Sequence, residues 1–376
     1  MVKTFDLQDD QPQPAAARKP RNGNGQRRRG KPKNQLDGWI VLDKPIGITS
    51  TQALGAVKRL FLPEKAGHAG TLDPLASGLL PLAFGDATKT VPYVVDGAKR
   101  YRFTVTWGAT TDTDDADGSV IASSDVRPGR EAIEAALPAF VGEIMQIPPQ
   151  YSAVKINGQR AYDLAREGEV VDIKARTVTI TRLAIVGEPA ADTCVLEADC
   201  GKGTYVRAIA RDLAQALGTE GHVSQLRRTR VGPFDEADMV TLDDLREMAA
   251  ADPQAAIDAR LLSPALALDG LPAAEVDRVA ASRLKRGQGA ILRPLRDDLE
   301  GSEVRAMMAG ELIALCRAEQ SELHPVRVFR GGRRRITITP PAQAEAKAAA
   351  ASAAAENDAD ASAAAEHEAL AVSAAH

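Results

Sequence analysis

Strand and helix signals alternate irregularly through the middle of this 376-residue chain, and that order limits the folds open to it. Residues 101–107 alternate between apolar and polar side chains, as a strand does. Helix signals at 131–140 and 208–217 are separated by two further strand signals, at 178–181 and 193–198. Because several strand signals are spaced like hairpins, the order predicts a mixed α/β sheet rather than a doubly wound parallel one.

The folded part is expected to open with a strand and a helix. Residues 36–45 form a short apolar run that ends at a proline, which predicts a strand. Thr49 or Ser50 can cap the helix that follows, because a side-chain oxygen there can accept a hydrogen bond from the first turn. The apolar residues of that helix fall on one face: Leu54, Val57, Leu60 and Phe61.

Composition divides the chain into four segments. Residues 1–35 are rich in Pro, Gly, Asn, Gln and Arg and lack hydrophobic periodicity, which predicts a disordered basic arm. A larger folded domain is expected over 36–265 and ends where Ala and Asp dominate. Short apolar runs separated by Gly, Pro and charges predict a small β-rich domain at 266–340. Residues 341–376 are rich in alanine with scattered acids and are expected to be disordered.

Charge and cysteine usage suggest a cytoplasmic protein that can bind nucleic acid. The net charge is −4, but the arm is basic and the last segment acidic, so the acidic tail is expected to hide part of the positive charge of the folded region. Cys194, Cys200 and Cys316 form no CxxC pair, which favours reduced, packed thiols. No apolar stretch is as long as a membrane span, and the N-terminus has no apolar signal core.

A glycine-rich segment, GHAGTLDPLASG (67–78), contains a candidate nucleophile. Its glycines permit unusual backbone dihedrals, and Pro74 stiffens the chain directly after Asp73. A carboxylate held rigidly in such a loop can act as a nucleophile. The alternative from the residues alone is that Asp-Pro only starts a turn.

Three other patterns do not support a metal or phosphate site. Four aspartates before Gly118 suggest a calcium loop, but in the required phase Thr113 would be the first ligand and Ser124 the twelfth. The segment GKGT at 201–204 lacks the glycine spacing and the Lys-Ser/Thr step of a phosphate loop. The histidines beyond the glycine-rich segment are too scattered to form a metal motif. The four aspartates are Asp112, Asp114, Asp115 and Asp117.

Six ordered motifs resemble the bacterial tRNA pseudouridine synthase B family. GHAGTLDPLASGLLPLAFGDATK (67–89) is similar to that family's catalytic motif, and LDKPIGITS (42–50) looks like its opening motif. The other four match in order and spacing: KRYRFTVTWGATTDTDDADG (99–118), IPPQYSAVKINGQRAYDLAREG (147–168), CGKGTYVRAIARDLAQALG (200–218) and HVSQLRRTRVGPF (222–234). The resemblance covers about residues 36–265 and is weaker beyond them.

The resemblance implies an enzyme without a metal or redox cofactor that isomerises uridine to pseudouridine at position 55 in the T-arm loop of tRNA. Asp73 stands at the family's catalytic aspartate. The uridine must be turned out of its stack to reach a pocket. The carboxylate can add to the uracil ring, attack the anomeric carbon, or remove a ribose proton to give a glycal. These three routes stay open.

The same resemblance assigns roles to other residues. Tyr101 matches an active-site tyrosine whose ring can stack on the extruded uracil, and Arg207 matches a basic partner that favours the ionised aspartate. Residues that match substrate contacts are His68, Tyr205 and Leu226, and the pair that matches a support for the catalytic loop is Lys44 and Pro45. Candidates for phosphate contacts are Arg160, Arg227, Arg228 and Arg230.

The implied fold is that of a pseudouridine synthase, with a mixed, largely antiparallel sheet flanked by helices and a PUA-like RNA-binding domain at 266–340. The implied protein is a monomer that acts on the T-arm of tRNA without a membrane or an obligatory protein partner. Two rival classes stay open. One is an RNA-binding or RNA-folding protein without catalysis, and the other is a glycoside hydrolase, which would take a second carboxylate from the four aspartates.

Overall fold

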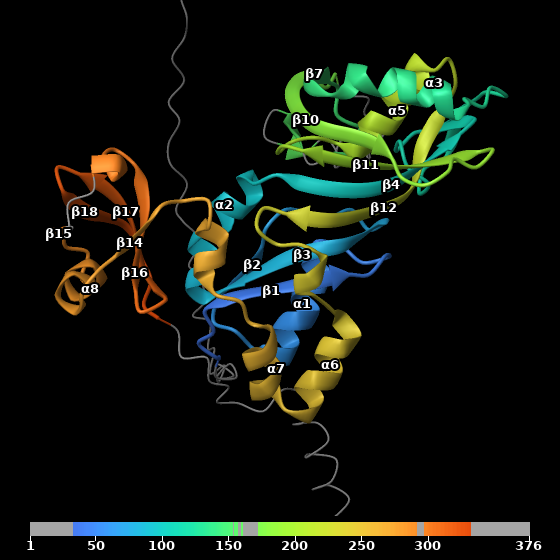
Figure 1. Cartoon of the computed structure of the whole chain (residues 1–376). Coiled ribbons are helices and arrows are strands. Elements are labelled where there is room, and N and C mark those ends of the chain that lie inside the picture. Colours follow the sequence, from blue (N-terminus) through green and yellow to red (C-terminus); the bar gives the residue numbers. More distant parts are fainter. Residues whose placement is uncertain (1–32, 153, 157–158, 161–171, 292–296, 332–376) are drawn as a thin grey trace, which may run out of the picture. The chain divides into compact units, whose positions relative to one another are not determined.

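A computed structural model describes residues 33–152, 154–156, 159–160, 172–291 and 297–331. The predicted tail, and all of the predicted arm except residues 33–35, lie outside the described residues, as does the side chain of Arg160. Within the described residues a nine-stranded sheet has the order β13-β1-β3-β12-β4-β11-β10-β7, with β2 beside β3 (Figure 1). Its strands are β1 Gly38–Lys44, β2 Ala66–His68, β3 Ala76–Phe84, β4 Lys99–Trp107, β7 Gly142–Gln146, β10 Arg176–Ile185, β11 Thr193–Cys200, β12 Gly221–Val231 and β13 Met239–Thr241.

Strand direction within this sheet is mixed. β1 runs parallel to β13, and β12 runs parallel to β3. The other pairings, including the long ones of β4 with β11 and β12, are antiparallel. The prediction of a mixed, largely antiparallel α/β sheet is therefore confirmed.

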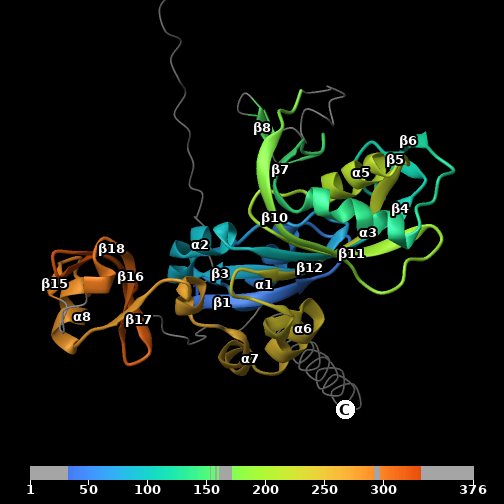
Figure 2. The same cartoon turned by 45° about the horizontal axis from the view of Figure 1, so that its top comes forward.

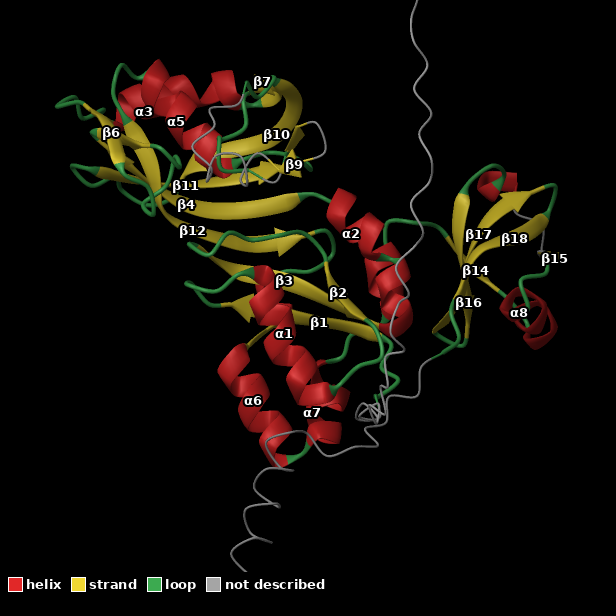
Figure 3. Cartoon of the chain, turned by 180° about the vertical axis from the view of Figure 1, so that it is seen from behind, coloured by secondary structure: helices red, strands yellow, loops and turns green. Residues whose placement is uncertain are grey.

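Both faces of the sheet are buried at β1 and β3, whereas β4 alternates between buried and accessible residues. Trp39 and Val41 of β1 pack into one apolar cluster, whereas Ile40 and Leu42 point the other way into the largest one. That largest cluster also takes side chains from α1, α5, α6 and α7, and Figure 3 shows α1, α6 and α7 next to one another. The helices of this domain are α1 Ser50–Phe61, α2 Val91–Asp96, α3 Arg130–Ala136, α5 Val206–Ala216, α6 Leu242–Ala251 and α7 Pro253–Arg260.

Two predicted helices differ in detail from the observed ones. Thr49, not Ser50, caps α1: its hydroxyl accepts from the amide of Gln52, and the Gln52 side chain accepts from the amide of Thr49 in return. The helix predicted over 131–140 ends earlier, at Ala136, and continues as a short 3₁₀ turn. Pro138 explains this, because it has no N–H to donate to the preceding α-helical turn.

The C-terminal region forms a second sheet of five strands in the order β14-β16-β17-β18-β15, and α8 lies against it (Figure 2). It has its own apolar cluster, which includes Leu284, Val304, Ile313 and Leu323. The β-rich character expected of this region is confirmed, whereas its PUA-like identity and the domain boundaries stay predictions. The elements are β14 Ala273–Glu275, α8 Arg278–Lys285, β15 Ala290–Ile291, β16 Glu303–Met308, β17 Glu311–Glu319 and β18 Glu322–Val328.

Candidate active site

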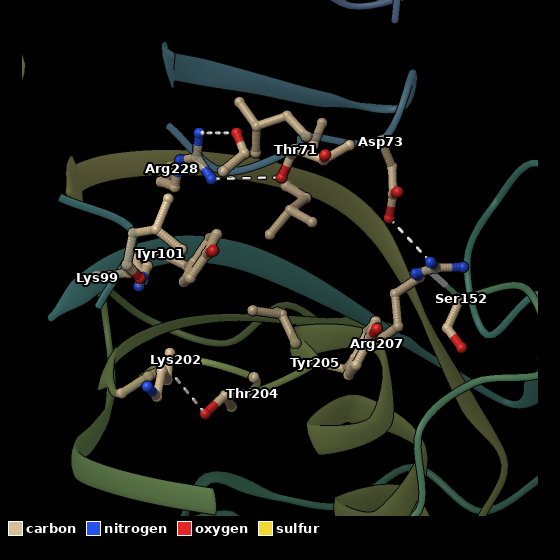
Figure 4. A pocket seen from close by; sticks show the side chains of 18 of the residues that line it. Thr71, Asp73, Lys99, Tyr101, Ser152, Lys202, Thr204, Tyr205, Arg207 and Arg228 are labelled. Carbon is tan, nitrogen blue, oxygen red and sulfur yellow. Dashed lines mark hydrogen bonds and ion pairs between the residues drawn. The ribbon is translucent and has the colours of Figure 1, made fainter. Parts of the chain in front are cut away.

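A cavity of about 310 Å³ opens where the loop before β3, the centre of the sheet and the start of α5 meet (Figure 4). The loop before β3 supplies one wall with residues 70–73. Tyr101 from β4 and Leu226 from β12 supply another, and residues 201–207 close the opposite side. Residues far apart in the sequence therefore meet at one pocket.

Asp73 reaches this pocket from a tightly turned loop. Gly70 has a φ of +89°, a left-handed conformation that side chains rarely adopt. The amide of Ala76 donates to the carbonyl of Asp73 (3.1 Å), which closes a turn over Pro74. The Asp73 side chain remains 44% exposed, so its carboxylate faces open space and can meet a substrate.

Arg207 lies directly opposite Asp73, in the first turn of α5. Its Nη2 is 2.9 Å from Oδ2 of Asp73, and its side chain is only 6% exposed. The guanidinium also donates to the backbone carbonyls of Thr113 and Tyr151, both at 2.9 Å. A buried guanidinium with this many fixed acceptors has one orientation, so it presents a fixed positive charge to the aspartate.

Asp115 is the other acidic partner of Arg207, and sequence reasoning missed it. Its Oδ2 is 3.1 Å from Nη1 of Arg207, and its side chain is 6% exposed. The neighbouring Asp114 pairs with Arg211 at 2.8 Å, one helical turn further along α5. Burial raises the pKa of Asp114, and the charge of Arg211 opposes that rise. The sequence shows two adjacent acids and two arginines four residues apart on one helix face, but it does not show that these two segments meet.

Tyr101 presents its ring to the pocket from β4 (Figure 4). Burial raises the pKa of its hydroxyl, and the nearby positive charge of Arg228 partly offsets this rise. The phenol is therefore neutral near pH 7. A half-buried neutral ring at this position can stack on a base.

Arg228 is buried beneath the loop, which corrects its expected role as a phosphate contact. It is 1% exposed and donates to the carbonyls of Leu79 (2.8 Å), Gly70 (3.2 Å) and Thr71 (3.4 Å). Its charge therefore acts inside the pocket wall. Arg227 is half-buried and forms ion pairs with Asp43 and Glu236, so two carboxylates already offset its charge. Arg230 is exposed and stays a candidate.

The remaining predicted residues fall into two groups. Tyr205 and Leu226 line the pocket, and the guanidinium of Arg176 lies 4.9 Å from the ring centre of Tyr205. His68, Lys44 and Pro45 do not line it. His68 lies on β2, and Lys44 and Pro45 line a separate cavity of about 730 Å³. Their substrate-binding and supporting roles stay predictions.

Lys44 is a buried cation held by carbonyl oxygens. Its ammonium group donates to the carbonyls of Pro45 (2.9 Å) and Ile48 (2.8 Å). Burial lowers its pKa to about 8, and the charge of Asp73 partly offsets that fall. Lys44 therefore braces the segment that leads into α1.

The pocket is lined by more basic than acidic side chains, although Lys202 also pairs with Asp96 outside the lining. Among the described residues that line it, Asp73 is the only acid, whereas Lys99, Lys202, Arg176, Arg207 and Arg228 are basic. The Lys99 ammonium donates only to carbonyls in the described structure, those of Val95 and Gly97. A cleft of this charge attracts a polyanion.

The described residues contain neither a membrane-spanning helix nor a metal-binding cluster. No helix in them is both long enough and apolar enough to cross a membrane. No cluster of three or more His, Cys, Asp or Glu side chains within them is arranged to hold a metal ion.

Comparison with known proteins points to one family. Residues 58–206 match the family model of the TruB family pseudouridylate synthase N-terminal domain, and residues 207–268 match that of the tRNA pseudouridylate synthase B C-terminal domain. A tRNA pseudouridine synthase B from Bradyrhizobium diazoefficiens is 54% identical over 83% of this chain and 90% of its own length. One from Brucella ovis is 50% identical over 81% of this chain and 99% of its own.

A solved structure described as a Cbf5-Nop10-Gar1 complex shares the fold at a TM-score of 0.59 and 28% identity, covering 78% of this chain and 84% of that one. Together the two family models span more than half of the chain, and the curated relatives match nearly their whole lengths. The chain therefore belongs to the TruB family of pseudouridylate synthases.

Proposed function

We propose that this protein isomerises uridine 55 in the T-arm loop of tRNA to pseudouridine, with Asp73 as the nucleophile. The observation that carries the proposal is the ion pair of the half-exposed Asp73 carboxylate with the buried, fixed guanidinium of Arg207, inside a pocket that Tyr101 also lines. The names of the relatives support tRNA as the substrate.

The chemistry needs one carboxylate and a shaped pocket. The bond between N1 of the uracil and the ribose breaks, the uracil turns over, and its C5 forms a new bond to the same ribose carbon. C5 then loses its hydrogen as a proton, and N1 gains a proton. No atom or electron is gained or lost. Asp73 can serve by adding to the ring, by attacking the anomeric carbon, or by removing a ribose proton, while Arg207 stabilises its charged form.

The pocket also weakens the rival reading of a glycoside hydrolase. Such an enzyme takes a second carboxylate as acid or base. Neither Asp114 nor Asp115 lines the pocket, and each pairs with an arginine of α5. Among the described residues that line the pocket, Asp73 is the only acid, so no second carboxylate is in place there to act as acid or base.

The decisive experiment compares the full chain with its Asp73→Asn variant on an unmodified tRNA transcript. We expect the wild-type protein to form pseudouridine at position 55 and the variant to form none while binding tRNA with similar affinity. Nucleoside analysis and a reverse-transcription stop assay detect product and position. Asp192→Asn is the matched control, because Asp192 pairs with Arg127 on the surface with a side chain that is 67% exposed.

Each other outcome has a clear meaning. Release of free uracil would identify a hydrolase, and unchanged nucleosides with tight binding would identify an RNA-binding protein. Pseudouridine at another position would contradict the T-arm assignment. Full activity of Asp73→Asn would remove the aspartate from the chemistry.

A further inference from the structure

Ser50, the first residue of α1, makes both of its side-chain hydrogen bonds to the residue before the proposed nucleophile. Its Oγ accepts from the amide of Leu72 (2.8 Å) and donates to the carbonyl of the same residue (3.1 Å). Ser50 is only 1% exposed. We infer that Ser50 is a positioning residue, whose hydroxyl fixes the backbone of Leu72 and thereby sets where the Asp73 carboxylate lies. The inference rests on the proposed role of Asp73.

The loop is held on both sides of Asp73 by the same short segment. Ser50 holds Leu72, and the amide of Gly47 donates to the carbonyl of Pro74 (2.8 Å). Residues 47–50 thus form hydrogen bonds to both neighbours of Asp73 and leave its side chain free to project into the pocket. The remaining freedom of the carboxylate lies mainly in its own side-chain torsions.

Residues 47–50 are themselves held in place by hydrogen bonds. Thr49 and Gln52 form a reciprocal capping pair at the start of α1, with hydrogen bonds of 2.8 and 3.1 Å. The Lys44 ammonium donates to the carbonyl of Ile48 (2.8 Å). Ser50 therefore lies at a helix end that is fixed in place, and its hydroxyl in turn fixes the backbone of Leu72.

The contacts distinguish this role from general stabilisation of the helix. Within the described residues, both hydrogen bonds of the Ser50 hydroxyl go to Leu72, 22 residues further along the chain, and neither goes to α1 itself. Ser50 does not line the pocket, so its effect on substrate must pass through the loop. Displacing a reacting group by about 1 Å can slow a reaction about a hundredfold, so hydrogen bonds that fix the position of Asp73 affect the reaction rate.

The experiment compares Ser50→Ala with Thr241→Ala in the full chain. Both remove one hydroxyl at the start of a helix, but only that of Ser50 is bonded to the loop of Asp73, whereas the Thr241 hydroxyl caps α6 by accepting from the amide of Asp244. We expect Ser50→Ala to lower the single-turnover rate of pseudouridine formation by about ten- to a hundredfold without changing tRNA affinity. Thr241→Ala should keep the wild-type rate at temperatures well below its melting midpoint, although it lowers that midpoint.

Amide hydrogen exchange tests the hydrogen bond between the Leu72 amide and Ser50 directly. In the wild-type protein the Leu72 amide should exchange slowly, because Ser50 accepts its proton, and in Ser50→Ala it should exchange faster. Unprotected Leu72 in the wild-type protein would overturn the inference even if the variant failed to fold. So would equal rate losses in the two variants, or a loss confined to tRNA affinity.

These outcomes are separable from those that test the proposed function. If Asp73→Asn is inactive and Ser50→Ala keeps the wild-type rate, the positioning role of Ser50 is wrong and the nucleophile assignment stands. If Asp73→Asn is active, the proposed nucleophile is wrong whatever Ser50 does. A slow Ser50→Ala alongside an inactive Asp73→Asn supports both.

Discussion

At the scale of single residues, the pocket depends on one guanidinium shared by two carboxylates. Arg207 is 2.9 Å from Asp73 and 3.1 Å from Asp115. The two acids differ in access: the side chain of Asp73 is 44% exposed and that of Asp115 is 6% exposed. Asp115 therefore offsets the cost of burying the guanidinium, and Asp73 stays available to the substrate.

This division predicts the effect of Asp115→Asn. Loss of the buried charge leaves Arg207 without its second acidic partner, so the guanidinium can shift or bind Asp73 more closely. We expect the single-turnover rate to fall at least about tenfold, equivalent to about 1.4 kcal/mol in the barrier, with little change in tRNA affinity. Quenched-flow measurement of product against time checks the rate.

Asp114→Asn is the matched control for that experiment. Asp114 lies on the same loop and also pairs with α5, but its partner Arg211 does not line the pocket. It should lower thermal stability and leave the rate near that of the wild-type protein. Equal loss of rate in both variants would show that the loop matters only as a fold element.

At the scale of elements, the site depends on β3 and β12, which lie side by side at the centre of the sheet. Gly78 on β3 pairs with Arg228 on β12. It has a φ of +96°, and a Cβ built there would lie 2.3 Å from the carbonyl oxygen of Arg228. No side chain fits this position without moving one of the two strands.

Gly78→Ala should therefore be costly. A positive φ and a backbone clash act together, and we expect a loss of at least about 2 kcal/mol in the free energy of unfolding. Activity should fall as well, because Arg228 donates hydrogen bonds to the carbonyls of Gly70 and Thr71, in the loop that carries Asp73. Chemical denaturation of the variant measures the first effect.

Gly270→Ala is the control, since Gly270 is exposed, has no positive φ, and has nothing within 4 Å of a Cβ built there. It should change stability by no more than about 0.5 kcal/mol. A similar loss in both variants would contradict the packing argument.

Local patterns predicted some elements and missed others for physical reasons. The strand at 101–107 and the helix at 208–217 were predicted because each buries one face in a regular period. β12 was missed, because its three arginines conceal the alternation of a buried strand. Burial of Arg228 depends on carbonyls of β3 and of the loop before it, about 150 residues away in sequence, which no local pattern records.

The candidate site shows the same division. The motif at 67–89 singled out Asp73, and the resemblance added Tyr101, Arg207, Tyr205 and Leu226, which line the same pocket. It also added His68, Lys44 and Pro45, which do not line it. Asp115 and Ser50 were not assigned to the site, because each acts through a contact with another segment of the chain. Such contacts exist only once the fold brings the segments together.

At the scale of the whole molecule, charge is organised locally. The expectation that an acidic tail hides a positive folded region is wrong: residues 36–340 contain 37 basic and 42 acidic residues, a net charge of −5. The positive character lies in the pocket lining and in the arm, where residues 1–35 hold nine basic and three acidic residues. Local positive charge of this kind can attract RNA even though the net charge of residues 36–340 is negative.

Deleting residues 1–35 tests the contribution of the arm. Each phosphate that the arm neutralises adds about 0.7 to 0.9 to the slope of log affinity against log salt concentration. We expect the truncated chain to bind tRNA more weakly at low salt, with a shallower slope, and to keep its single-turnover rate. Deleting residues 341–376, which hold six acids and one lysine, is the control and should not flatten the slope. Parallel salt plots for the full and arm-deleted chains would confine RNA attraction to the folded region.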